Sequence, residues 1–473
     1  MPTLDSDWNA KIRLLGYWWF ADKPESKVPG CLEIADGSIR LELIGTVEKH
    51  VFDRYSYEPI VHPIIQGVAQ GKFFTLVDCR TIGSEQSIGS NSSPVSKVDA
   101  SYAIEGAHFA NRESLQFDKA IVRYHYLEDW LQDQPVQREF PPQDDRDFTK
   151  RFVLPDDRTF ISSIDGSSLT FSSEYSSSIF GQSDNFSFRN TLLLKPSGEQ
   201  QLQWFVDRSN SICHLLSFLM GEKTAIASFQ LIKEDKSNAH VRPFTFFARH
   251  WVFNPAANKL HPLEMRYCYP TLKDRLTTLL DFWFARSDQF VTAFELVTGA
   301  QQDKDLPIRY QFLNCVHALE CLDRAVADRG YMSQEDYASV RHAIANAIPQ
   351  DLDSGHRDSI KKKIEYGYEY SLRKRLTEML RELPTNLSPM ICRSSQTFPG
   401  FIADTRNYFA HYTQELKERA VLDSHSLYWF SQQLSVWCTA VLLLQMGFNA
   451  EEVEYGICRC PRLRRSIEHG PEL

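Results

Sequence analysis

Residues 402–412 read Ile-Ala-Asp-Thr-Arg-Asn-Tyr-Phe-Ala-His-Tyr, and they are the most informative stretch of the chain. They place a guanidinium (Arg406), an amide (Asn407) and an imidazole (His411) within about one and a half turns of helix. Cleavage of RNA at its own 2′-hydroxyl needs a base, an acid and positive charge on the phosphorane. Histidine can serve as base and acid near neutral pH, and arginine supplies the charge. The stretch therefore predicts a ribonuclease site that needs no metal and no other cofactor.

The spacing of these residues limits how they can meet. At about 100° per residue, Asn407 and His411 share one face of a helix, whereas Arg406 and His411 lie about 140° apart. On a straight helix, one copy of the motif is therefore an incomplete pocket. Either the helix starts or bends within the motif, or a second subunit completes the site across a two-fold axis.

The context of Arg406 matters more than its distance from His411. The bare spacing is common, since it recurs at Arg208 with His214, Arg419 with His425 and Arg464 with His469. Only around Arg406 does an apolar pair precede the arginine, an asparagine follow it, and Phe-Ala lead into His-Tyr. With this context, residues 402–412 closely resemble the signature of the HEPN superfamily, in particular its ApeA-like branch.

The resemblance covers roughly the C-terminal 200 residues. Its further segments are 309–320, 368–376 and 427–448, which resemble in turn a helix with a glutamate on its buried face, a basic helix and a closing apolar helix. It implies that Glu320 lies opposite Arg406 and orients the guanidinium. The residues alone leave a second reading open, in which Glu320 forms an ordinary i,i+4 ion pair with Arg324. Segments 16–19, 28–32 and 39–43 resemble the first type of N-terminal domain found on these proteins.

The first half of the chain alternates with a period of two. Ile39, Leu41 and Leu43 alternate with Arg40 and Glu42, and similar runs continue to about residue 255. Ser/Gly/Asp-rich breaks, such as 83–96 and 172–184, separate the predicted strands. Residues 202–220 are the exception, because their apolar positions recur at helical spacing up to Gly221. The pattern predicts an antiparallel β-sandwich or barrel with one inserted helix.

The second half has helical periodicity, which begins after a segment (254–271) that holds three prolines. We expect six helices, at 272–297, from Pro307 to about 322, from Ser333 to before Pro349, and at 360–379, 401–418 and 427–444. The prediction is an α+β multidomain fold. It has a β-rich sensor or regulatory domain (1–255), a linker (256–271) and an all-α HEPN nuclease domain (272–473).

Composition narrows the classes of function. At 473 residues and 42% hydrophobic content the chain can form two or three cores, and its net charge of −9 argues against a protein coated in base. Ten cysteines form no zinc framework, which favours reduced thiols. The first residues lack the pattern of a signal peptide, and the longest apolar stretch, 436–448, is too short to cross a bilayer. We expect a cytoplasmic protein with no membrane contact.

RNA contacts outside the motif must be local. Tyr412 is a candidate for stacking on a base. Three basic runs stand at 361–363, 373–375 and 459–465, and the last is the best candidate for the RNA backbone because it follows the bundle in an end expected to be flexible. Its arginines are Arg459, Arg462, Arg464 and Arg465.

The HEPN resemblance implies an endoribonuclease of anti-phage defence that arrests growth by abortive infection. Its expected partners are RNA, with tRNA as one candidate, a second copy of the chain in a homodimer or higher homo-oligomer, and a phage-derived trigger for the first domain. One alternative keeps the fold without the chemistry: a catalytically inactive HEPN dimerisation or RNA-binding module fused to a ligand-binding β domain.

Overall fold

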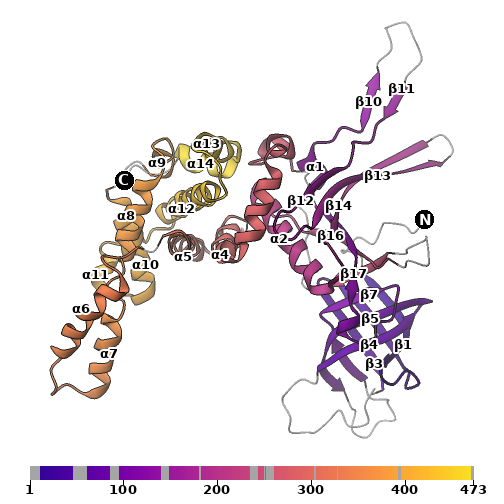
Figure 1. Ribbon diagram of the computed structural model, residues 1–473, viewed down its shortest axis with the longest axis horizontal. Coiled ribbons are helices and arrows are strands. Elements are labelled where there is room, and N and C mark those ends of the chain that lie inside the picture. Colours follow the sequence, from indigo (N-terminus) through magenta and orange to yellow (C-terminus); the bar gives the residue numbers. More distant parts are fainter. Residues whose placement is uncertain are drawn as a thin grey trace. The chain divides into compact units, whose positions relative to one another are not determined.

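The computed structural model describes residues 11–45, 61–85, 95–139, 149–180, 183–234, 243–249, 251, 260–302, 305–327, 329–392 and 396–469. By its internal contacts the chain divides into two compact units. The first holds residues 1–220, 224–262 and 267–281, and the second holds 221–223, 263–266 and 282–473. Figure 1 follows the chain from the strands of the first unit to the helices of the second. The domain limits drawn from the sequence stay a prediction.

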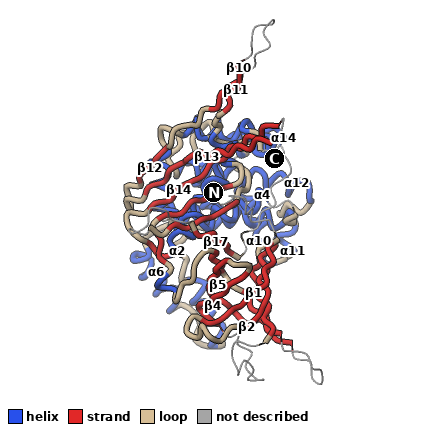
Figure 2. The backbone as a smooth tube through the Cα atoms, turned by 90° about the vertical axis from the view of Figure 1, so that its right-hand side faces the viewer, coloured by secondary structure: helices blue, strands red, loops and turns tan. Residues whose placement is uncertain are grey.

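Six antiparallel strands of the first unit close into a barrel. They are β1 (Ile12–Phe20), β2 (Val28–Ala35), β3 (Ser38–Ile44), β4 (Val61–Ala69), β5 (Lys72–Glu85) and β6 (Val95–Asp99). The order is β5-β4-β1-β2-β3-β6, and an additional pairing of β5 with β6 completes the ring. Figure 2 shows these strands in red at one end of the unit. The alternation read in β3 is confirmed, because Ile39, Leu41 and Leu43 are buried whereas Arg40 and Glu42 are exposed.

Side chains fill the inside of the barrel. Trp18 is fully buried, and a Cβ added to Gly67 on the neighbouring strand would lie 2.1 Å from its indole ring. Trp19 is also buried, and its Nε1 donates a hydrogen bond to Gln66 Oε1 at 3.0 Å. Trp18 therefore packs in the barrel core, whereas Trp19, on the opposite face of β1, is held by its hydrogen bond to Gln66.

The sheet continues from β5 beyond the barrel. Further antiparallel strands follow in the order β7 (Tyr102–Glu105), β17 (Phe244–Ala248), β16 (Ile226–Ile232), β9 (Lys119–Tyr124), β14 (Ser183–Lys195), β13 (Ser168–Phe180) and β12 (Arg158–Ile161). The prediction of a break over 172–184 is wrong for most of that segment, because cross-strand pairing with β14 extends β13 to Phe180. The inserted helix is confirmed as α2 (Leu202–Met220), and Gly221 ends it with φ of 74°.

The second unit is helical. Its helices are α4 (Leu276–Gln302, from Phe282 onward), α5 (Ile308–Val326), α6 (Gln334–Asn346), α7 (Ser354–Ile364), α8 (Leu372–Glu382), α9 (Ser388–Ile391), α10 (Phe398–His411), α11 (Gln414–Lys417), α12 (Ser424–Gln445), α13 (Ala450–Arg459) and α14 (Pro461–His469). The predicted start of α6 at Ser333 is confirmed, since the Ser333 side chain caps the helix by accepting a hydrogen bond from Asp336 N.

Three predictions for the helical half are wrong. The segment 360–379 forms two helices, because Ser371 caps a new start at α8. The predicted helix 401–418 ends at His411, since Tyr412 adopts a left-handed conformation with φ of 53°. The C-terminal end, expected to be flexible, forms α13 and α14, because Ile457, Cys460 and Leu463 are buried.

Helix α12 lies in the core of the bundle. Among the described residues it is the one helix that is long and apolar enough to span a membrane, but 78% of its apolar window is buried inside the protein. Cys438 on α12 contacts the Cys315 carbonyl of α5, with Sγ 3.4 Å from the oxygen. Its length and hydropathy are therefore explained by its central place in the bundle.

Candidate functional site

Helix α10 carries the Arg-Asn-His motif and is fixed by its apolar face. Phe398 and Ile402 are buried, and the Phe398 ring packs against Phe430 and Trp437 of α12 at centroid distances of 5.4 and 6.3 Å. Thr405 is buried as well, and its Oγ1 accepts a hydrogen bond from Val421 N at 2.9 Å. The motif residues therefore occupy the remaining, accessible face of a firmly held helix.

Arg406 faces Glu320 of α5. Its Nη2 lies 3.4 and 3.5 Å from the two carboxylate oxygens, and its Nη1 donates to Asn407 Oδ1 at 3.1 Å. One nitrogen serves both oxygens, so the contact is weaker than a two-nitrogen fork. Arg324, the i,i+4 neighbour of Glu320, instead donates to Glu369 at 2.8 Å. Glu320 therefore orients the Arg406 guanidinium, and Asn407 braces it from the same helix.

His411 is the last residue of α10 and is exposed. In the described part of the chain no hydrogen bond joins its ring to Arg406 or Asn407. The next residue, Tyr412, is 59% exposed, and its N–H donates to Tyr408 O at 2.7 Å. Within the chain, the imidazole thus stands at the helix end while the guanidinium is turned toward α5.

Arg309 is a neighbour of the motif for which no role was predicted. It lies in the first turn of α5, donates through Nη1 to the Tyr412 hydroxyl at 3.0 Å, and stacks over the Phe409 ring at 4.8 Å. It therefore fixes the turn that follows His411. No spacing rule could have found this contact, because its partners are 103 residues apart in the chain.

The basic run 373–375 is structural rather than free. Arg373 Nη2 lies 2.9 Å from both oxygens of Asp404, which stands two residues before Arg406 on α10. Arg375 is buried and donates to Asp323 at 2.8 Å and to Glu369 at 3.0 Å. Helix α8 is thereby tied to both helices of the site, α5 and α10.

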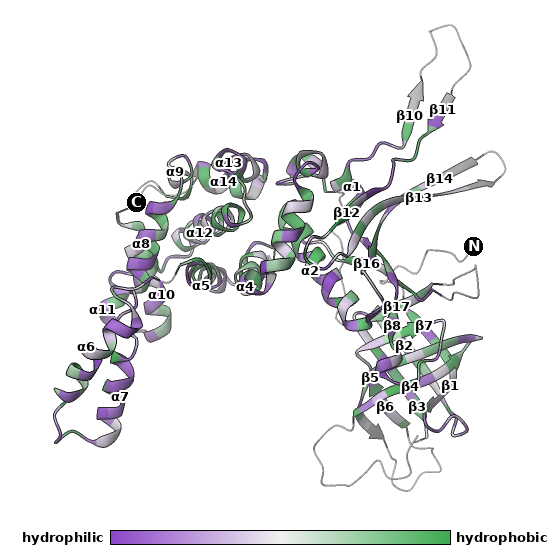
Figure 3. Ribbon diagram, viewed as in Figure 1, coloured by the Kyte–Doolittle hydropathy of each residue, from purple (hydrophilic) through white to green (hydrophobic). Residues whose placement is uncertain are grey.

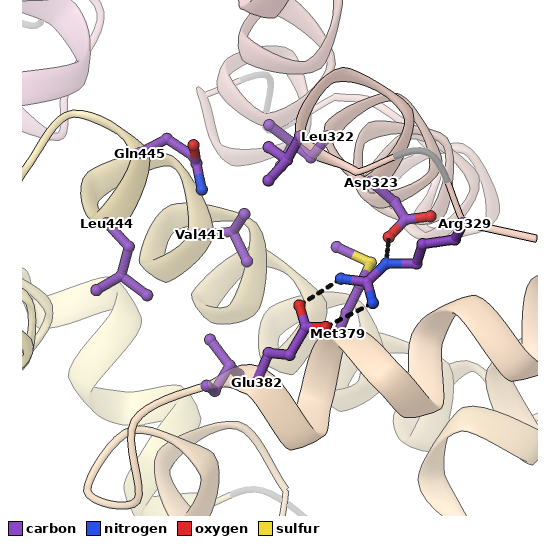
Figure 4. Close-up of a pocket in the computed structure, with 10 residues that line it drawn as sticks. Leu322, Asp323, Arg329, Met379, Glu382, Val441, Leu444 and Gln445 are labelled. Atoms are coloured by element: carbon purple, nitrogen blue, oxygen red, sulfur yellow. Dashed lines mark hydrogen bonds and ion pairs between the residues drawn. The ribbon is translucent and has the colours of Figure 1, made fainter.

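Asp323 is the centre of a buried ion-pair network one turn after Glu320. Its side chain is 1% exposed and accepts from Arg329 Nε at 2.6 Å as well as from Arg375. Arg329 also pairs with Glu382, and this hydrogen bond raises the pKa of Arg329 and lowers the pKa of Glu382. Figure 4 shows the pair at the edge of a small cavity of about 130 Å³ beside Met379 and Val441.

The arginines predicted to bind RNA lie away from the motif. Arg459 donates to the Tyr455 hydroxyl one turn earlier, and Arg464 Nε is 3.7 Å from Glu468. Arg465 is exposed, whereas the side chain of Arg462 lies outside the described residues. Figure 1 draws α13 and α14 at one end of the bundle and α10 toward the other. The structure therefore brings Glu320, Asn407 and Arg406 together but not these arginines.

Within the described residues, no group of three or more His, Cys, Asp or Glu side chains is placed to hold a metal ion. Comparison with protein families gives two matches. The family model described as ApeA N-terminal domain 1 matches residues 13–283, and the one described as Apea-like HEPN matches residues 313–452, which include Glu320 and the whole motif. HEPN domains are generally associated with nucleases. No curated protein and no solved structure matches the chain. The chain belongs to the ApeA-type HEPN proteins, with an ApeA N-terminal domain 1 followed by an Apea-like HEPN domain.

Proposed function

We propose that the protein is a metal-independent endoribonuclease of anti-phage defence, held in check by its N-terminal domain until a phage-derived trigger acts. The observation that carries the proposal is the arrangement at α10: Glu320 and Asn407 hold the Arg406 guanidinium, and the accessible His411 ends the same helix. Its place of action is the cytoplasm, where RNA is available.

In the proposed reaction, the 2′-oxygen of a ribose attacks the adjacent phosphorus and the bond from phosphorus to the 5′-oxygen breaks. His411 takes the proton of the 2′-hydroxyl, and a second imidazole gives a proton to the leaving 5′-oxygen. Arg406 stabilises the negative charge of the phosphorane, and Asn407 holds a phosphate oxygen or the imidazole tautomer. The products are a 2′,3′-cyclic phosphate and a 5′-hydroxyl.

The second imidazole is proposed to come from another copy of the chain. HEPN domains commonly bind RNA and dimerise. Support comes from the separation of the two groups within one subunit, where Arg406 turns toward α5 and His411 stands at the helix end. A two-fold axis beside α10 would bring two motifs to one phosphate. Tyr412 is then a stacking surface for a base, and Arg459, Arg464 and Arg465 serve as contacts for more distant phosphates of a structured RNA such as tRNA.

The test is cleavage of tRNA or total RNA by the purified protein in excess EDTA, with the ends of the products analysed. Arg406→Ala and His411→Ala should each lower the rate at least about a hundredfold. Arg419→Ala, in an exposed Arg/His pair of similar spacing, is the matched control. Arg208 is a poorer control, because it forms an ion pair with Asp165. A folded His411→Ala protein that cuts at the wild-type rate would overturn the proposal.

A second candidate function is RNA binding without cleavage. It is favoured by one observation: in the described part of the chain, the His411 ring has no hydrogen-bond partner that would set its tautomer. RNA that is bound but stays intact, with the same affinity in wild type and His411→Ala, would support this candidate.

A further inference from the structure

Helices α6 and α7 form an arm of the second unit. Figure 1 shows the two helices side by side, extending from the rest of the bundle. Tyr337 of α6 joins the two helices of the arm, since it is buried and its hydroxyl donates to Ile364 O of α7 at 2.8 Å. Each helix has its own cap, Ser333 for α6 and Asp353 for α7. The arm is therefore an ordered helical hairpin, although most of its side chains are exposed.

A groove of about 390 Å³ runs between the two helices. Its α6 wall is one face of the helix, because the lining positions recur at intervals of three and four. The lining residues are Ala338, Arg341, His342 and Ala345 from α6, and Lys361, Lys362, Ile364 and Glu365 from α7. Three cations and a histidine thus share one groove with a single acid.

The cations of this groove differ from five arginines of α5, α8, α10 and the residue Arg329. Arg324, Arg329, Arg373, Arg375 and Arg406 all have carboxylate partners. By contrast, Arg341, Lys361 and Lys362 are exposed, and within the described part of the chain none of them forms an ion pair. In a protein of net charge −9, the lining of this groove carries an excess of positive charge, with three cations against one acid. Such a site favours an anion with several charges.

We propose that the groove between α6 and α7 binds the phosphates of an RNA strand and holds that strand beside the Arg406–His411 site. The groove is open rather than enclosed, as a polymer requires. Tyr366, two residues beyond Ile364, is 60% exposed and adds a ring on which a base can stack. In Figure 3, α7 is largely hydrophilic, which suits a phosphate backbone better than an apolar partner.

Short connections link the base of the arm to the catalytic helices. Beyond Tyr366, Glu369 pairs with Arg324, one turn from Glu320 on α5. Next along the chain, Arg373 pairs with Asp404, two residues before Arg406 on α10. A strand bound in the groove therefore lies at the same end of the bundle as the motif. The assignment of a cleaved strand rests on the proposed function, whereas binding itself does not.

The test measures binding separately from cleavage. A fluorescent single-stranded RNA is titrated with His411→Ala protein at several salt concentrations, and fluorescence anisotropy gives the Kd. Each lost phosphate contact lowers the slope of log K against log salt by about 0.7 for single strands. The triple variant Arg341→Ala/Lys361→Ala/Lys362→Ala should therefore lose about 2 from the slope, and at about 0.15 M salt it should bind roughly fifty-fold more weakly.

Two variants define the chemistry. Lys361→Arg/Lys362→Arg keeps the charge and should keep the affinity, whereas Glu365→Gln removes the one acid of the groove and should tighten binding. The triple variant Lys11→Ala/Lys23→Ala/Lys195→Ala, at exposed positions of the first unit, removes equal charge elsewhere and should leave the Kd within about twofold. Circular dichroism checks that all variants fold.

Equal weakening by both triple variants, or an unchanged salt slope in the groove variant, would overturn the site. If the protein with His411 intact cleaves RNA, kinetics give a second test. The triple variant of the groove should then raise KM for long RNA and leave the cleavage rate of a dinucleotide unchanged. A protein that binds RNA through the groove but cuts none would refute the nuclease and leave this inference standing.

Discussion

Removing the carboxylate of Asp323 should loosen the helix that presents Glu320. Asp323 is 1% exposed, and its two partners, Arg329 and Arg375, are 13% and 6% exposed. Asp323→Ala leaves both guanidiniums without their shared partner. Removal of one member of a buried pair costs about 3–5 kcal/mol. Each arginine keeps a second carboxylate, Glu382 or Glu369, so we expect a cost near the lower limit, about 3 kcal/mol.

Hydrogen exchange read by mass spectrometry can measure this loss in the bundle alone. About 3 kcal/mol corresponds to roughly a hundredfold faster exchange of α5 amides that open with the network. Glu468→Gln, in the exposed pair with Arg464, is the control and should cost less than about 1 kcal/mol. The double variant Asp323→Ala/Arg375→Leu should lose less than the sum of the single changes, because no unpaired charge remains at that position. A rise of under about fivefold in Asp323→Ala, or strict additivity in the double variant, would refute this account of the network.

Three further outcomes follow from the site and its ion pairs. Mixing Arg406→Ala with His411→Ala subunits should restore cleavage if one composite site suffices. The shared site would be ruled out by a wild-type protein that is monomeric by light scattering and cleaves RNA with a first-order dependence on enzyme concentration. Glu320→Gln should lower the cleavage rate about tenfold, because it frees the Arg406 guanidinium. Loss of the partly exposed Glu320–Arg406 pair should change the free energy of unfolding by less than about 1 kcal/mol. A kcat equal to that of the wild type would show that Glu320 is not part of the site. The hydrogen bond from Arg329 lowers the pKa of Glu382 from its ordinary value of 4.5. The stability that Glu382 contributes is therefore full above about pH 4.5 and is lost as pH falls through the lowered pKa. The free energies of urea unfolding of wild type and Glu382→Gln should converge in acid, and a difference that stays constant with pH would contradict this.

The sequence by itself determined the elements whose signals are local. Alternation in Ile39, Leu41 and Leu43 identified a barrel strand, and the run ending at Gly221 gave both limits of α2. A period of two or 3.6 reports which side chains share a face, so burial of that face fixes the element. The placement of Arg406, Asn407 and His411 on one helix was likewise readable, because all three lie within six consecutive residues.

Tertiary structure decided closure and the choice of partners. The barrel closes because β5 pairs with β6 as well as β4, with a register shift between Thr81 and Gly83, and no local pattern encodes this pairing. Glu320 faces Arg406, 86 residues away, although Arg324 is four residues away in the sequence. Arg375 belongs to one of the three basic runs of the sequence and is buried, whereas Lys361 and Lys362 line an open groove with Arg341. The partner of a charged side chain depends on how far the side chain is buried and on which opposite charges lie within reach. The packing of helices that are distant in the sequence sets both the burial and the distances.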